Sequence, residues 1–352
     1  MSTANSGSLP RILSGVQSSG KLHIGNYFGA IKQHIERQTH GDCFFFIADY
    51  HALTSLKEAE EKELAAAAKD KKLIPRPARQ ILADNVRDVA IDYLALGLDP
   101  AKAAFFRQSD VPEVCELAWI LSTVAGMGLL ERAHSYKDKV AKGFTPNVGL
   151  FTYPILMAAD ILIYRSHLVP VGRDQEQHLE MTRDIAGSFN HAFGEVFPMP
   201  EAVFNEAAIV PGTDGQKMSK SYGNTIDIFA EGKALERAVM GIVTDKTPLE
   251  APLNPDTCNV FSLYKLFASP PEIEALAAKY RAGGFGYGSA KKELLGKIDG
   301  YFAAARERRK QLERNPGLVE EALTTGAQRA RAVAQITMRL VRERVGIHQR
   351  PV

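Results

Sequence analysis

The sequence predicts an α/β protein, a doubly wound parallel sheet followed by a smaller C-terminal all-helical domain. Residues 43–48, Cys-Phe-Phe-Phe-Ile-Ala, form a continuous apolar run of the kind that is buried on both faces of a parallel sheet. Short runs of this type alternate along the chain with longer segments of helical spacing. After about Ile228 the strand signals cease, so the remainder is predicted to be helical.

Four strands are predicted from short apolar runs that are bounded by polar or glycine-rich turns. The first run leads into the polar turn Gln-Ser-Ser-Gly at 17–20, which is typical of a buried strand that ends at a tight turn. Right-handed crossovers place the loops that follow parallel strands on one edge of the sheet, where ligands bind in folds of this class. The predicted strands are residues 11–16, 43–49, 103–106 and 168–172.

The predicted helices lie between these strands and after them. From His23 onward, Ile24, Phe28 and Ile31 share one helical face. Asp174 is predicted to cap a further helix, with Gln177 reaching back to the cap. The remaining helical segments are residues 59–72, 78–96 and most of 114–164. The glycines at 283–288 lack a preceding strand and are predicted to connect helices.

Composition narrows the class of protein. The chain has 352 residues, 45% hydrophobic and 24% charged, with a net charge of +2, which neither requires nor excludes a nucleic-acid partner. Its three cysteines are far apart, so no zinc site or disulfide framework is expected and a cytoplasmic location is favoured. No run approaches the roughly 20 apolar residues that span a bilayer, so no membrane association is expected. Residues 1–8 are small and polar, and a disordered tail is expected there.

Two motifs carry the chemistry. His-Ile-Gly-Asn at 23–26 starts a helix just after the first strand, and Lys-Met-Ser-Lys-Ser at 217–221 follows a glycine-containing loop. A helix N-terminus presents unpaired N–H groups to a triphosphate, and Gly25 lets adenine approach the backbone without a Cβ in the way. Lys217 and Lys220 supply mobile positive charge for pyrophosphate. Each motif alone could be an ordinary helix start or a solvated turn, and their occurrence in this order points to nucleotide chemistry.

The two motifs together resemble the signature pair of class I aminoacyl-tRNA synthetases. Three further segments resemble the tryptophanyl-tRNA synthetases of bacterial type, and the similarity runs from about Arg11 to the C-terminal helices. These segments are Ser-Gly-Val-Gln-Ser-Ser-Gly at 14–20, Thr-Tyr-Pro-Ile-Leu-Met-Ala-Ala-Asp-Ile-Leu at 152–162 and Val-Pro-Val-Gly-Arg-Asp-Gln-Glu-Gln-His at 169–178.

The resemblance implies an amino-acid site around Asp160, which would accept a hydrogen bond from the indole N–H of tryptophan. Asp160 follows an apolar run, so an unpaired carboxylate there would be costly. A buried acceptor that only an N–H donor satisfies can reject phenylalanine by about 10⁴-fold. Without the resemblance, the apolar members of this site read as ordinary core, and His51 as a polar loop residue. The other residues implied at this site are Gly15, His51, Tyr153, Met157, Val171 and Gln175.

The resemblance also implies an ATP site that both motifs form. His23, Asn26, Lys217 and Lys220 would stabilise the transferring phosphates, with Mg²⁺ bound mainly through the nucleotide and no zinc. Lys139 resembles a family lysine that reaches the phosphates, although a solvated helix end is the alternative there. The other residues implied at the ATP site are Gln17, Ser18, Ser19, Gly25, Gly172, Arg173, Asp174, Ile209, Met218, Ser219 and Ser221.

The sequence departs from the family pattern in three places. Asn26 replaces the histidine of many class I enzymes, which is usual in the tryptophan branch. Ser18 stands where proline is common, and Leu13 where an aromatic residue often lines the pocket. Leu13 puts the tightness of indole packing in doubt but does not affect the reaction.

The resemblance implies activation of L-tryptophan with ATP and transfer to tRNA(Trp). It implies a Rossmann-like catalytic domain at 9–227 and a helical tRNA- and anticodon-binding domain at 228–352, whose last helix packs back on the catalytic domain. The basic runs at 306–310 and 329–344 would face tRNA. A helical insertion at about 110–150, which contains Trp119, would form a homodimer interface, and burial of this segment within one chain is an equal alternative.

Three other functions compete with this interpretation. A tyrosine-specific sister enzyme would share both motifs, but the run that ends at Asp160 is of the tryptophan type. A small-molecule nucleotidyltransferase would have no need for the lysine loop or a basic helical domain. A non-catalytic paralogue that binds tRNA or an amino acid would be expected to lose motif residues, and all of those that the chemistry needs are present here.

Overall fold

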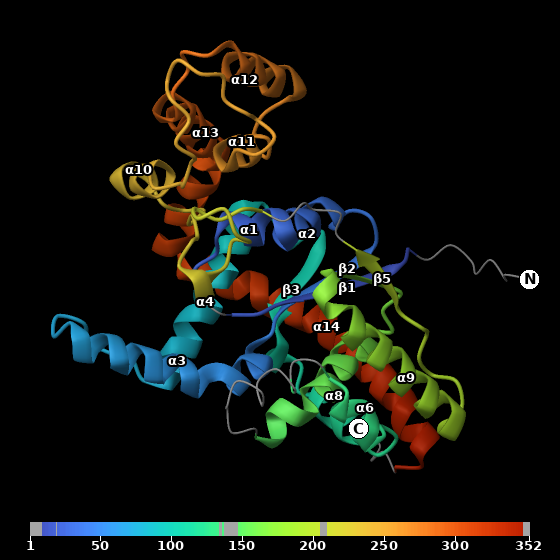
Figure 1. Cartoon of the computed structure of the whole chain (residues 1–352). Helices are drawn as coiled ribbons and strands as arrows, with labels where there is room; N and C mark the ends of the chain where they lie inside the picture. Colours follow the sequence, from blue (N-terminus) through green and yellow to red (C-terminus); the bar gives the residue numbers. More distant parts are fainter. Residues whose placement is uncertain (1–8, 19, 134–135, 137–146, 205–209, 348–352) are drawn as a thin grey trace, which may run out of the picture.

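The computed structural model describes residues 9–18, 20–133, 136, 147–204 and 210–347. Its core is a sheet of five parallel strands in the order β3-β2-β1-β4-β5, which confirms the predicted fold class (Figure 1). The strand order reverses between β1 and β4, and in doubly wound sheets ligands bind at this point, outside the carboxyl ends of the strands. The strands are β1 (Arg11–Val16), β2 (Asp42–Ile47), β3 (Ala103–Arg107), β4 (Leu168–Val171) and β5 (Glu201–Phe204).

Both faces of the sheet are buried, as the continuous apolar run in β2 predicts. Phe45 contributes to the hydrophobic core on one face, while Phe44 and Phe46 contribute to the core on the other. β3 alternates in the same way, with Phe105 on the first side and Phe106 on the second. Successive side chains of a strand point to opposite faces, so an unbroken apolar run fits only a sheet that is covered on both sides.

Helices cover the two faces of this sheet. α4 and α13 pack into the core on the Phe45 side, and α5, α8 and α9 pack into the core on the Phe44 side, while α14 contributes to both. The helices up to residue 193 are α1 (Ile24–Asn26), α2 (Lys32–Arg37), α3 (Asp49–Lys69), α4 (Ala78–Leu96), α5 (Glu113–Ser122), α6 (Met127–Glu131), α8 (Val148–Ile163) and α9 (Glu176–Phe193).

Some predicted boundaries were wrong. The helix expected at 59–72 begins ten residues earlier, at Asp49, immediately after β2. The structure also adds β5, which was not predicted because Glu201–Phe204 is short and carries no fully buried residue. Both errors arise where tertiary packing, not local hydrophobicity, decides the conformation.

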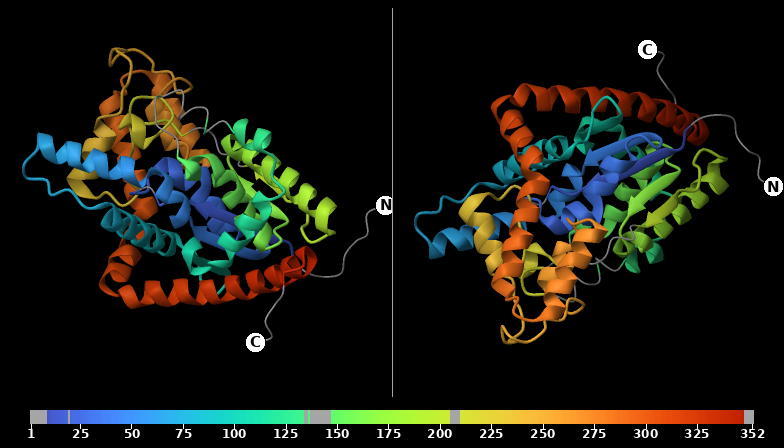
Figure 2. Two further views of the ribbon diagram at one scale, coloured as in Figure 1. Left: turned by 90° about the horizontal axis from the view of Figure 1, so that it is seen from below. Right: turned by 90° about the horizontal axis from the view of Figure 1, so that it is seen from above.

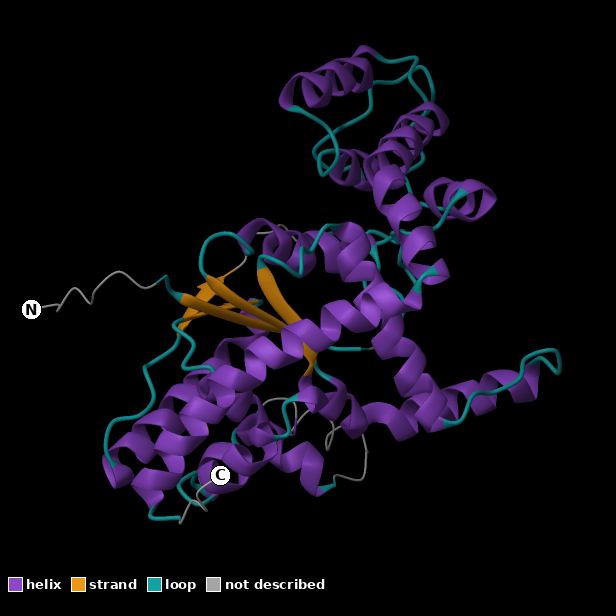
Figure 3. Cartoon of the chain, turned by 180° about the vertical axis from the view of Figure 1, so that it is seen from behind, coloured by secondary structure: helices purple, strands orange, loops and turns teal. Residues whose placement is uncertain are grey.

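The region after Ile228 contains helices and no strand among the residues that the structure describes. Figure 3 shows most of these helices standing beyond one end of the sheet. They are α10 (Gly232–Met240), α11 (Asn259–Tyr264), α12 (Pro270–Ala282), α13 (Tyr287–Arg314) and α14 (Pro316–Val345).

The last helix, α14, returns and lies along the sheet (Figure 2). Gly326 makes this packing possible, because a Cβ at this position would lie 2.0 Å from the carbonyl oxygen of Phe105 in β3. At the same strand, Arg107 donates to Glu320 of α14. The helix therefore approaches the backbone of the sheet more closely than any larger residue at position 326 would allow.

Several arginines of the basic runs that are expected to face tRNA also bind within the chain. Arg309 donates to the buried Asp92 of α4 at 2.7 Å, and Arg308 donates to the carbonyl of Ala95 at 2.7 Å. In α14, Arg331 and Arg342 pair with Glu113 and Glu116 of α5. These guanidinium groups attach α13 and α14 to the sheet-bearing part of the protein, because their carboxylate and carbonyl partners lie on it.

Candidate functional site

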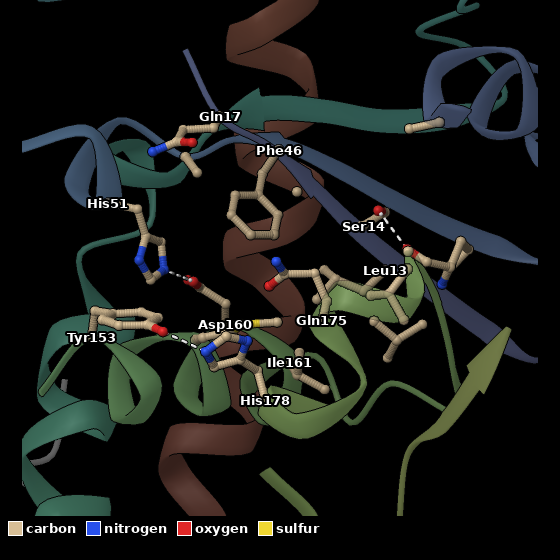
Figure 4. A pocket seen from close by; sticks show the side chains of 18 of the residues that line it. Leu13, Ser14, Gln17, Phe46, His51, Tyr153, Asp160, Ile161, Gln175 and His178 are labelled. Carbon is tan, nitrogen blue, oxygen red and sulfur yellow. Dashed lines mark hydrogen bonds and ion pairs between the residues drawn. The ribbon is translucent and has the colours of Figure 1, made fainter. Parts of the chain in front are cut away.

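A cavity of about 620 Å³ opens at the carboxyl ends of β1 and β4, where the strand order reverses (Figure 4). Ser14 and Gly15 of β1 line it from one side, and Val171 and Gly172 at the end of β4 line it from the other. Ser14 donates from its hydroxyl to the carbonyl of Pro170 at 3.0 Å, which joins the two strands below the cavity. The residues that the sequence assigned to the amino-acid site all line this cavity: Gly15, His51, Tyr153, Met157, Asp160, Val171 and Gln175.

Asp160 of α8 is the buried acid of this cavity, with 3% of its surface exposed. Its carboxylate accepts from His51 Nε2 at 2.9 Å and from Gln108 Nε2 at 2.8 and 2.9 Å. Burial raises the pKa of Asp160, while the contacts with His51 and Gln108 oppose that shift. The expectation that only a substrate donor would satisfy this carboxylate was therefore wrong, because two side chains of the chain already do so.

The wall of the cavity beside Asp160 is aromatic and polar. Figure 4 shows His51, Tyr153, Gln175 and His178 gathered around Asp160. Tyr153 and the buried His178 share a hydrogen bond, and the rings of His51 and Tyr153 meet edge to face with centroids 6.4 Å apart. A planar ring that carries one N–H donor has complementary partners here: flat aromatic edges and a buried acceptor.

The predicted helix cap at Asp174 was wrong. Residues Arg173–Gln175 form a 3₁₀ turn that begins after Gly172, and α9 begins only at Glu176. Gln177 donates from its Nε2 to the carbonyl of Arg132 at 3.0 Å. The turn arises because the Gln175 N–H bonds the Gly172 carbonyl at 2.9 Å, one residue short of a helical turn. Gln175 lines the cavity from this turn.

The first nucleotide motif forms a helix start with an internal cap. The side chain of Asn26 accepts from the His23 N–H at 3.1 Å, and the Ile24 N–H donates to the Ile226 carbonyl at 3.0 Å. Burial, with Lys220 as the second cause, lowers the pKa of His23 to about 4. His23 is therefore a neutral ring at pH 7.

The second motif directly contacts the first. The Gly25 N–H points at the sulfur of Met218 at 3.3 Å, and Met218 is buried. A Cβ at Gly25 would lie 3.2 Å from Met218 Cβ and 3.0 Å from His23 Nδ1. Gly25 thus makes room for Met218 and the His23 ring. Segments almost 200 residues apart meet here, as a shared nucleotide site requires.

Asn224, which the sequence analysis missed, holds the lysine loop in shape. Its side chain accepts from the Ser219 N–H at 2.8 Å and donates to Asp214 at 2.7 Å and to the Lys217 carbonyl at 3.2 Å. Asn224 is 2% exposed. Gly212 lies so close to this amide that a Cβ there would approach within 2.3 Å of its nitrogen. Burial lowers the pKa of Lys220, an effect that Asp92 and Asp227 oppose.

The remaining predicted ATP-site residues are distributed around the same region. Gln17 lines the main cavity and also an adjoining cavity of about 350 Å³, which Ser18 lines too. The guanidinium of Arg173 lies 5.0 Å from the ring centre of Phe204 in β5. Within the loop, Ser219 accepts from the Ser221 N–H at 3.3 Å. Ser19, Lys139, Ile209 and the side chain of Asp174 lie outside the described residues.

Two searches of the described residues were negative. They contain no group of three or more histidine, cysteine or acidic side chains arranged to hold a metal ion. Among the described helices, none combines the length and apolar composition that crossing a bilayer requires.

Comparison with known proteins agrees with this geometry. The family model for class I tRNA synthetases (W and Y) matches residues 5–303. A tryptophan–tRNA ligase of Rhodopirellula baltica is 52% identical over 338 residues, which cover 96% of this chain and 99% of the relative. One of Fusobacterium nucleatum is 53% identical over 341 residues, covering 96% and 98%.

Solved structures give the same result. A crystal structure of tryptophanyl-tRNA synthetase from Campylobacter jejuni, complexed with ADP and tryptophan, is similar with a TM-score of 0.86. Its sequence is 48% identical, and the match covers 96% of this chain and 99% of that one. The chain therefore belongs to the class I tRNA synthetases, in the tryptophanyl-tRNA synthetase family.

Proposed function

We propose that this chain is a tryptophan–tRNA ligase. It activates L-tryptophan with ATP to tryptophanyl-adenylate and pyrophosphate, and then transfers tryptophan to tRNA(Trp). The observation that carries the proposal is the cavity at the end of β1 and β4. It places the buried acceptor Asp160 among aromatic side chains, beside the strand and turn that lead to His23. Relatives about half identical over nearly the whole chain support it.

In the first step, the tryptophan carboxylate attacks the α-phosphorus of ATP in line and expels pyrophosphate. No covalent intermediate with the protein is required, so the protein contributes positioning and charge stabilisation. His23 and Asn26 act on one side of the nucleotide, and Lys217 and Lys220 act on the β- and γ-phosphates. Mg²⁺ enters as part of the ATP substrate and is held mainly by the phosphates.

In the second step, the 2′-hydroxyl of the terminal adenosine of tRNA attacks the acyl carbon of the adenylate. The helical region after residue 228 contacts tRNA(Trp), and this binding is salt-sensitive because phosphate contacts release counterions. The arginines that pair within the chain, such as Arg309 and Arg342, are not part of that contact surface. The reaction takes place in the cytoplasm.

A homodimer completes the proposal. Trp119, Met127 and Val148 are 74%, 63% and 77% exposed, and they come from the predicted interface segment and its border. Large apolar side chains that are exposed on the single chain are candidates for burial against a partner. Light scattering should show a dimer that Trp119→Glu weakens, whereas Leu318→Glu, at an exposed leucine of α14, leaves it intact. A monomeric wild-type chain contradicts this part of the proposal.

The test of the activity is amino-acid-dependent ATP–pyrophosphate exchange with each of the twenty amino acids. Tryptophan should be the substrate that stimulates exchange. Asp160→Ala should abolish that stimulation, while Asn254→Ala, at an exposed loop residue of the helical region, should not affect it. Stimulation by tyrosine instead would assign the chain to the tyrosine-specific branch, and no stimulation at all would favour a non-catalytic paralogue.

A further inference from the structure

Asp160 has a second intrachain donor that the proposed mechanism does not use. Gln108 follows β3 directly and begins the 3₁₀ turn Gln108–Asp110. Only 2% of its surface is exposed, and it is not among the residues that line the cavity. Its Nε2 lies 2.8 Å from one oxygen of Asp160 and 2.9 Å from the other. Gln108 therefore reaches the amino-acid site indirectly, through residues that line the cavity, of which Asp160 is the one its NH₂ contacts.

The orientation of the Gln108 amide is fixed by the start of α3. Its Oε1 accepts from the backbone N–H groups of Tyr50 at 3.1 Å and of His51 at 3.4 Å. A backbone N–H can only donate, so the carbonyl of Gln108 must face α3 and its NH₂ must face Asp160. A flipped amide would place its oxygen against the carboxylate and its NH₂ against two N–H donors.

The segment that carries Gln108 is itself attached to α3. The carboxylate of Asp49, the first residue of α3, accepts from the Ser109 N–H at 3.0 Å and also from the Ser109 hydroxyl. Gln108 and Ser109 thus both bind the start of α3. Gln108 accepts from backbone N–H groups of the helix, and Ser109 donates to Asp49. His51, the other donor to Asp160, lies on the same first turn of α3.

We propose that Gln108 is a specificity-determining positioning residue, which presents Asp160 as an oriented acceptor to a ring N–H in the cavity. This inference rests on the proposed function. An ionised carboxylate offers about four acceptor positions. Gln108 occupies one acceptor position on each oxygen of Asp160, and His51 occupies the second position on Oδ2. The remaining acceptor position therefore lies on Oδ1. Because both donors are fixed by α3, this direction is fixed as well.

A role in capping α3 alone is the competing explanation, and one substitution separates the two. Gln108→Glu keeps an oxygen acceptor for the N–H groups of Tyr50 and His51, so it preserves the cap. It also sets a carboxyl group against Asp160, where two like charges cannot both be held at hydrogen-bond distance. Gln108→Met removes both functions without adding charge. If Gln108 only caps the helix, Gln108→Glu resembles the wild type.

The control is Gln38→Glu, at another buried glutamine that bridges two backbone groups. Gln38 donates to the Gly97 carbonyl at 3.3 Å and accepts from the Asp99 N–H at 2.8 Å, with no carboxylate side chain on its NH₂. The Gln38→Glu variant measures how much activity is lost when a buried glutamine is replaced by glutamate away from Asp160.

The experiment measures ATP–pyrophosphate exchange with L-tryptophan and with β-(3-benzothienyl)-L-alanine, in which sulfur replaces the ring N–H. We expect Gln108→Glu and Gln108→Met to raise KM for tryptophan at least tenfold with kcat changed less than threefold. We also expect both to lower the tryptophan-to-analogue ratio of kcat/KM at least tenfold, while Gln38→Glu preserves that ratio. If Gln108→Glu does not fold, Gln108→Met alone decides by the same ratio.

The outcomes separate this inference from the function on which it rests. A wild-type chain that activates tryptophan, together with variants that keep the ratio within twofold, overturns the role of Gln108 and leaves the function intact. A parallel loss of kcat for both substrates, with the ratio unchanged, also overturns it, because that pattern indicates a structural role only. A wild-type chain that does not activate tryptophan contradicts the proposed function itself.

Discussion

Replacement of Asn224 by alanine should disable the lysine loop and leave the tryptophan site intact. The Asn224 side chain makes three hydrogen bonds, which link Ser219, Asp214 and Lys217 into one loop conformation. Each contributes about 1 kcal/mol net, so the ordered loop loses about 3 kcal/mol relative to its disordered forms. Met218 contacts Gly25 in the ordered loop. Loss of that order should therefore cost the lysines their position against the nucleotide.

The magnitude follows from that free energy. A loss of about 3 kcal/mol corresponds to a reduction of about 160-fold in kcat/KM for ATP, as an upper limit for a loop that must be ordered to react. Tryptophan affinity in the absence of ATP should change less than twofold, because no residue of 210–224 lines the amino-acid cavity. Apart from Met218, residues 213–223 are exposed or half-buried, so the global stability of the fold should change little.

The assay is ATP–pyrophosphate exchange at saturating tryptophan with ATP varied, combined with equilibrium binding of tryptophan without nucleotide. Asn254→Ala is the control, since Asn254 is an exposed loop asparagine with a similar local bond, to the Asp256 N–H. A parallel loss of tryptophan affinity and activation would refute the reasoning, since it would mean that the two half-sites are not separable. A change of less than threefold in kcat/KM for ATP would equally refute it.

Three further predictions follow from the same contacts. Lys217→Ala and Lys220→Ala should each depress tryptophan activation far more than tryptophan affinity, as measured by exchange kinetics and by equilibrium binding. An equal loss of activation and affinity would contradict the role assigned to these lysines. His23 has a pKa of about 4 in the fold against about 6.5 when unfolded, so the unfolded chain binds a proton first and stability is lost as pH falls from 6.5 to 4. Between pH 8 and pH 5, the free energy of unfolding, measured with urea, should fall by about 2 kcal/mol less in His23→Gln than in the wild type. An unchanged pH dependence would count against a buried neutral ring. Gly326→Ala should lower the free energy of unfolding by about 3 kcal/mol, because its Cβ would collide with the Phe105 carbonyl. The control Gly317→Ala, whose Cβ meets no atom within 4 Å, should be neutral. Equal effects of the two substitutions would contradict the close packing of α14.

The fold could be predicted where hydrophobic pattern alone decides the structure. The Cys43–Ala48 and Ala103–Phe106 runs are apolar at every position, and only a strand that is buried on both faces explains them. β5 carries no such run and forms because β4 offers it a hydrogen-bonding edge, which no local pattern reveals. The first turns of α3 escaped prediction for a related reason: side chains from another segment, Gln108 and Ser109, bind the start of this helix.

In the candidate site, too, the residues of recognisable motifs could be predicted, whereas those defined by contacts between segments could not. Residues such as Asp160 and His51 were identified from motifs, and the structure brings them together in one cavity. Gln108 and Asn224 were missed because an isolated buried amide has no sequence signature; their roles exist only in contacts with other segments. The intrachain bonds of Arg308 and Arg309 were not predicted, because a basic run looks the same whether its partners are phosphates or carboxylates and carbonyls of its own chain.

The most direct test of the account is a crystal structure of this chain with L-tryptophan and a non-hydrolysable ATP analogue. We expect one nucleotide to lie between residues 23–26 and residues 217–221, with Lys217 and Lys220 within hydrogen-bond distance of its β- and γ-phosphates. We also expect the indole nitrogen within 3.2 Å of Asp160 Oδ1, about the upper limit for an N–H···O bond. A nucleotide bound away from either segment, or an indole ring that donates to no oxygen of Asp160, would contradict the account.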